Sequence, residues 1–110
     1  IEWEGDVTES GFSFYSNYAI ADSLPSNIDE QRLINYANET TERDHGMQII
    51  SIGKDSIGNT WYGLKNSWGK AGKYGGIWYM NENYFKWKTV TLIVHKEGLP
   101  LILRKKLYIE

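Results

Sequence analysis

The chain has 110 residues, a formal net charge of −2, an apolar fraction of 41% and a charged fraction of 24%. This length suits one small domain or part of a larger one, and this composition favours folding over disorder. The net negative charge argues against a nucleic-acid or anionic-membrane surface. No apolar run approaches the roughly 20 residues that span a bilayer. The absence of cysteine excludes disulfides and thiolate metal sites.

The sequence opens Ile1-Glu2-Trp3-Glu4, without an initiator methionine, a basic segment or the apolar core of a signal peptide. It reads as though the chain starts inside a strand. We therefore expect an excised piece or a mature product, and the sequence gives no localisation.

The first part of the chain predicts little regular structure. Residues 1–7 alternate apolar and acidic side chains, which predicts a short edge strand. Residues 8–17 predict an irregular loop whose Phe12 and Phe14 tuck under the core, and residues 18–21 predict a brief extended piece.

A helix is expected over about residues 29–38, because Asn27 or Asp29 can cap it. Its apolar residues recur at a partly helical spacing: Ile28, Leu33, Ile34 and Ala37.

Two apolar runs separated by turn residues predict a β-hairpin in the middle of the chain. His45 begins the first run, which covers residues 47–52, and Asn66 follows the second, residues 61–64. The stretch 55–59, Asp-Ser-Ile-Gly-Asn, favours a turn. Strands that pair antiparallel about this turn would make His45 and Asn66 neighbours at the open end of the hairpin.

The last part of the chain predicts two further strands, over residues 77–80 and 89–94, after a glycine-rich loop at 69–76 that lacks a phosphate-binding pattern. Asn81 can cap a single helical turn between these strands. Pro100 suits the first turn of a C-terminal helix, for which a terminal strand is the alternative. These elements predict one α+β unit over residues 1–110, mostly antiparallel β, with one or two short helices.

A histidine beside an asparagine amide is two thirds of a Cys-His-Asn site. The amide oxygen would accept a proton from one ring nitrogen of His45 and leave the other nitrogen to serve a thiol, which this chain lacks. The plainer interpretations are that His45 bonds to backbone at a strand end, that Asn66 is a turn residue before Gly69, and that Trp68 belongs to the core. We expect His95 to be solvated, and two histidines without an acidic cluster predict neither a metal site nor a cofactor.

Several motifs resemble those of papain-like cysteine peptidases. His45 followed by Asn66-Ser67-Trp68-Gly69 is similar to the C-terminal half of these enzymes, and Asp44-His45-Gly46-Met47 resembles the histidine motif of the bleomycin hydrolase (aminopeptidase C) branch. Residues 3–12 and 74–80 resemble segments of the same branch. The similarity covers nearly the whole chain.

The resemblance implies the right-hand, half-barrel-like β domain of the papain fold, which lacks the nucleophilic Cys and oxyanion-hole Gln of the left-hand, mostly helical domain. It implies that His45 is the general base and acid, that Asn66 orients it, and that Trp68 shields their hydrogen bond from water, while Asp44 has no catalytic role. It also implies a peptide substrate and an N-terminal half as partner, so the fragment alone should be inactive. In this branch the C-terminus lies in the cleft and limits cleavage to N-terminal trimming, and Ile109-Glu110 is the candidate for that position.

Two alternatives stay open. In place of a peptidase half, the chain could be a non-catalytic binding module that keeps an aromatic groove. It could instead be a structural module that oligomerises through the face normally buried between the two domains. Five tryptophans and eight tyrosines, several beside glycines, fit such a groove or the aromatic filling of a small β core.

Overall fold

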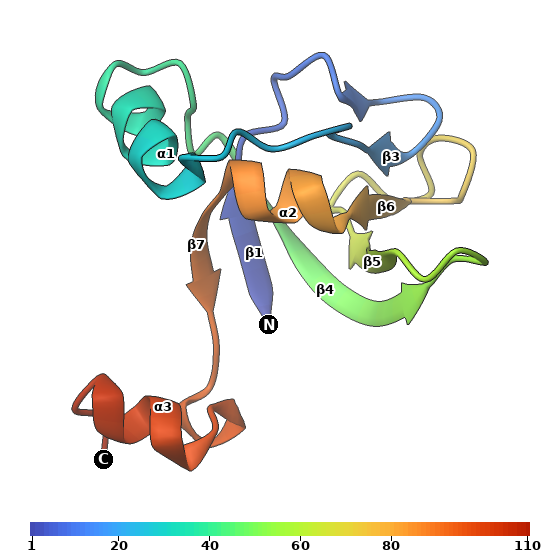
Figure 1. Ribbon diagram of the computed structural model, residues 1–110. Helices are drawn as coiled ribbons and strands as arrows, with labels where there is room; N and C mark the ends of the chain where they lie inside the picture. Colours follow the sequence, from blue (N-terminus) through green and yellow to red (C-terminus); the bar gives the residue numbers. More distant parts are fainter.

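One curled sheet of seven strands forms the body of the protein (Figure 1). The computed structural model describes all of residues 1–110, and the strands lie in the order β2-β3-β6-β5-β4-β1-β7. Neighbouring strands are antiparallel except β3 and β6, which run parallel. The strands are β1 (Glu2–Gly5), β2 (Phe12–Ser13), β3 (Tyr18–Ala19), β4 (His45–Lys54), β5 (Thr60–Lys65), β6 (Ile77–Asn81) and β7 (Thr89–Ile93).

The chain also has short helices: α1 (Ile28–Ala37), α2 (Glu82–Lys88), the 3-10 turn η1 (Lys96–Gly98) and α3 (Leu101–Lys106). Figure 1 shows α2 between β6 and β7 and α3 apart from the sheet, beyond the end of β7. The α+β class with a mostly antiparallel, half-barrel-like sheet is therefore confirmed. None of the helices has the length and apolar character needed to cross a membrane.

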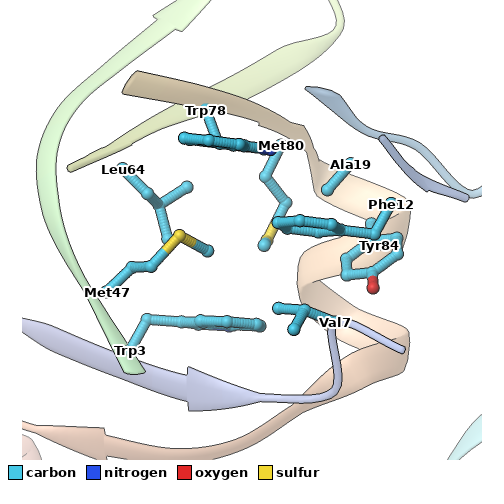
Figure 2. Close-up of a cluster of buried hydrophobic side chains, with 9 residues drawn as sticks. All are labelled: Trp3, Val7, Phe12, Ala19, Met47, Leu64, Trp78, Met80 and Tyr84. Atoms are coloured by element: carbon cyan, nitrogen blue, oxygen red, sulfur yellow. The ribbon is translucent and has the colours of Figure 1, made fainter. Parts of the chain in front are cut away.

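The core fills the inside of the curl, where Figure 2 shows side chains converging from several strands and α2. Alternate residues of a strand face the same side, so Trp3 of β1 and Met47 of β4 meet across their pairing, as do Leu64 of β5 and Trp78 of β6. Nine apolar side chains are buried: Trp3, Val7, Phe12, Ala19, Met47, Leu64, Trp78, Met80 and Tyr84.

Two predictions for the first part of the chain are wrong. β1 is not an edge strand, because β7 pairs with its second side, and a hydrogen bond of 2.7 Å from Trp3 Nε1 to Thr89 Oγ1 joins the two. Phe12 is buried as expected, but Phe14 is 54% exposed, because β2 ends at Ser13 and the chain turns there.

The predicted helix and hairpin are both present. Asn27 occupies the N-cap of α1 without a side-chain hydrogen bond, and the helix buries no residue. β4 and β5 pair antiparallel about the predicted turn, where the Asp55 carboxylate accepts the N–H of Asn59 at 2.9 Å and Gly58 has a φ of +88°.

The C-terminal part differs from the predictions in two details. Asn81 caps α2 by accepting the N–H of Tyr84, but the helix runs to Lys88, beyond the single turn expected. The tail forms α3 after Pro100, so the terminal-strand alternative is wrong.

Candidate functional site

His45 and Asn66 meet at the open end of the β4–β5 hairpin, although 21 positions separate them in the sequence. His45 is the first residue of β4, and Asn66 directly follows the last residue of β5. Asn66 Oδ1 lies 2.7 Å from His45 Nε2, with the amide 4% exposed and the imidazole partly buried. The predicted neighbours are therefore in direct contact.

A second hydrogen bond determines which ring nitrogen carries the proton. The N–H of Ser67 donates to the same Asn66 Oδ1 at 2.8 Å, and since a peptide N–H is always a donor, the atom it faces must be the amide oxygen. His45 Nε2 faces this oxygen too, so it must carry a hydrogen. The neutral ring then has its lone pair on Nδ1, which is the nitrogen that can accept a proton.

The other end of the Asn66 amide is buried without a partner. Asn66 Nδ2 has no hydrogen-bond acceptor, and an unpaired buried donor costs about 1–3 kcal/mol.

Trp68 covers the imidazole. Its ring lies 4.7 Å from the His45 ring, tilted by 31°, and meets Trp78 edge-on at 5.5 Å. Its ring also stacks on that of Phe14, with 5.5 Å between the ring centroids. Trp68 is 40% exposed, so the plain-core interpretation is wrong for this residue, which packs on the imidazole and also belongs to an exposed aromatic surface.

The connection between β5 and β6, residues 66–76, carries Asn66 and Trp68, and Asn17 fixes it. The N–H of Asn66 donates to the carbonyl of Gly76 at 3.0 Å, which closes the loop. Asn17, which is fully buried with a φ of 56°, donates from Nδ2 to the carbonyls of Ala71 and Ile77 at 3.0 Å each. The sequence analysis missed Asn17, and its only sequence signal is a residue type that tolerates positive φ.

The segment before His45 is held by carboxylates. Asp44 Oδ1 accepts the N–H of Val7 at 3.0 Å, and the buried Asp6 carboxylate accepts the N–H of Glu42 at 2.8 Å. Burial would raise the pKa of Asp6, but the hydrogen bonds from Glu42 and Thr8 and the charge of Lys88 outweigh it and hold the pKa below the usual 3.8. Asp6 is thus an ionised buried acid.

A shallow groove of about 410 Å³ runs beside Asn66 between β1, β4 and β5. Its lining residues are Ile1, Glu2, Gly46, Met47, Gln48, Lys65, Asn66 and Ser67. No group of three or more His, Asp or Glu side chains is placed to hold a metal ion. The exposed His95 lies apart from the pair and caps η1 by accepting the N–H of Glu97.

Comparison with known protein families agrees with the resemblance to papain-like peptidases. The model of the Peptidase C1-like family matches residues 7–108, which includes both His45 and Asn66. No curated protein matches the chain.

Proposed function

Because this chain belongs to the Peptidase C1-like family of papain-like peptidases, we propose that it supplies the histidine and asparagine of a cysteine peptidase site. The observation that supports this proposal is the 2.7 Å contact between His45 Nε2 and Asn66 Oδ1, which leaves Nδ1 as a base. The proposal includes the finer assignment to the C-terminal half of the bleomycin hydrolase branch, for which the Asp44-His45-Gly46-Met47 motif is the support.

In the proposed reaction, Nδ1 of His45 takes the proton of a cysteine thiol that lies outside these 110 residues. The thiolate attacks the peptide carbonyl carbon, and the imidazolium returns the proton to the departing amine as the C–N bond breaks. Water then attacks the thioester while His45 takes one of its protons, which frees the acid product and restores the thiol. His45 is thus base and acid in turn.

Asn66 and Trp68 would keep this proton transfer efficient. A ring held in one orientation needs no rearrangement between steps, and the amide oxygen of Asn66 holds it without adding a charge. Trp68 excludes water from the Asn66–His45 hydrogen bond, and a hydrogen bond is electrostatically stronger where water is excluded.

The proposed partner is an N-terminal half that carries the Cys and an oxyanion-hole Gln. N-terminal trimming would require Ile109 and Glu110 to lie beside His45, whereas here they follow α3, apart from the sheet (Figure 1). We therefore propose peptide-bond hydrolysis as the activity and make aminopeptidase action an outcome of the experiment.

The test uses a fluorogenic aminoacyl substrate. The 110-residue chain alone should show no turnover, whereas a mixture with the Cys-bearing half from the same gene should hydrolyse the substrate and lose this activity with a thiol reagent. His45→Ala in the mixture should abolish hydrolysis. Thiol-type turnover by the chain alone would overturn the proposal, and a substrate blocked at its α-amine distinguishes aminopeptidase from endopeptidase action.

One observation favours a second candidate, a non-catalytic binding module. The chain has no cysteine, yet Trp68 and Phe14 form an exposed aromatic stack beside His45. If the Cys-bearing half restores no activity but peptides with aromatic side chains bind the chain, and Trp68→Ala removes that binding, the binding module is the better assignment. Light scattering tests the oligomerising module in the same samples, since that function requires more than a monomer.

A further inference from the structure

The three residues before His45 have no regular secondary structure, so bonds to other segments determine their position. Asp6 Oδ2 accepts the N–H of Glu42 at 2.8 Å, and Asp44 Oδ1 accepts the N–H of Val7 at 3.0 Å. Asp6 and Val7, which directly follow β1, therefore hold this segment at both of its ends.

Thr8 links the two carboxylates. Its hydroxyl lies 2.9 Å from Asp6 Oδ1 and 2.7 Å from Asp44 Oδ2, and its N–H donates to Asp6 Oδ1 at 2.8 Å. A hydroxyl has one hydrogen, so it donates to one carboxylate at a time, and the shorter contact favours Asp44. Asp6 is 1% exposed while Thr8 and Asp44 lie at the surface, so the bridge runs from the interior to the residue next to His45.

The buried end of this bridge is anchored to α2. The carbonyl of Asp6 accepts the hydroxyl of Tyr84 at 2.5 Å. Lys88, which is 6% exposed, pairs with Glu9 at 2.8 Å and donates to Thr41 Oγ1 at 3.2 Å. The bridge is therefore fixed to a packed element of the fold.

We propose that Asp6 and Thr8 are positioning residues that act through Asp44 to set where His45 Nδ1 meets its thiol. The inference rests on the proposed function, because position matters most for a group that must reach a partner atom. A displacement of about 1 Å in such a group can cost about a hundredfold in rate. Neither residue touches the reacting atoms, so each would act only through the segment that carries the base.

The first experiment measures the geometry in the 110-residue chain. The Trp68 ring, 4.7 Å from His45, shifts the NMR signals of the imidazole protons by ring current, and this shift reports their relative placement. Thr8→Val removes the hydroxyl at nearly constant shape and should change the His45 shifts, whereas Thr8→Ser should restore them. Thr40→Val is the matched control, because it removes an exposed hydroxyl just before residues 42–44, and it should leave the His45 shifts unchanged.

Unchanged His45 shifts in Thr8→Val would overturn the proposal. So would a loss of folding in Thr8→Val together with unchanged shifts in the smaller Thr8→Ala, because the hydroxyl would then serve stability alone.

The second experiment measures rates in the mixture with the Cys-bearing half. Thr8→Val should lower kcat about tenfold with little change in KM, because the substrate contacts remain. An equal kcat for Thr8→Val and the unmodified chain would contradict the positioning role. Absence of activity in the unmodified mixture would instead contradict the proposed function, and the NMR measurement would then decide the positioning role by itself.

Discussion

Gly76 packs directly against the carbonyl of Gly69, so closely that a Cβ on Gly76 would lie 1.9 Å from that oxygen. Gly76 also has a φ of +93°, a backbone conformation that residues with a side chain rarely adopt. Its own carbonyl accepts the N–H of Asn66 at 3.0 Å, so the position of the site amide depends on this contact.

The first prediction follows from this contact. Gly76→Ala should lower the free energy of unfolding by about 2–4 kcal/mol, because it combines a backbone clash with an unfavourable φ. Urea unfolding followed by tryptophan fluorescence measures the loss. Gly53→Ala is the control, since a Cβ on Gly53 meets nothing within 4 Å, and equal effects of the two substitutions would contradict the explanation.

The second prediction concerns the amide oxygen of Asn66. Asn66→Ala removes the acceptor for His45 Nε2–H, so the imidazole proton should exchange rapidly with water and its NMR signal should disappear. Asn66→Asp keeps an acceptor at this position and should preserve the signal. A protected Nε2–H in the alanine variant would mean that another group holds the ring.

The third prediction concerns the cover that Trp68 gives this hydrogen bond. Trp68→Ala should speed the exchange of His45 Nε2–H with solvent, because it removes the ring 4.7 Å from the imidazole. Trp68→Phe, which keeps an aromatic face, should give an intermediate rate. The same rate in all three chains would show that Trp68 does not shield the pair.

The sequence predicted the parts of this fold that depend on neighbouring residues. The turn at 55–59 has its own hydrogen-bonding side chains, so the hairpin and the meeting of His45 with Asn66 followed from local chemistry. The internal position of β1 could not be predicted in this way, because its second partner, β7, lies more than 80 residues away. Nothing near Trp3 in the sequence indicates that pairing.

The supporting residues of the site were harder to predict for the same reason. Asn17 holds a loop 54 and 60 positions away, and Asp6 reaches Glu42, 36 positions away. Asn17 lies in a predicted loop, where short polar side chains are common for local reasons, and Asp6 lies in a predicted edge strand, where an acidic side chain suggests exposure to solvent. Their burial depends on the packing of segments that are distant in the sequence, so only the structure shows it.

The fourth prediction is that acid destabilises the protein through Asp6. The folded state holds the pKa of Asp6 below its usual 3.8, while an unfolded aspartate has a pKa of about 3.9. The unfolded state therefore binds more protons in this range, so the stabilisation from Asp6 is fully present above about pH 4 and is lost as the pH falls through the folded value. Urea unfolding at a series of pH values from about 7 to 3 measures this loss.

Asp6→Asn should separate this contribution from those of the other acids. An amide accepts through one oxygen only, so it cannot replace both carboxylate oxygens that bind Glu42 and Thr8. The variant should be less stable near pH 7 and should lose less of its remaining stability on acidification. Asp29→Asn, at the exposed start of α1, should keep the pH dependence of the unmodified chain. If both variants keep the pH dependence of stability of the unmodified chain, the stabilising hydrogen bonds of Asp6 do not depend on its charge.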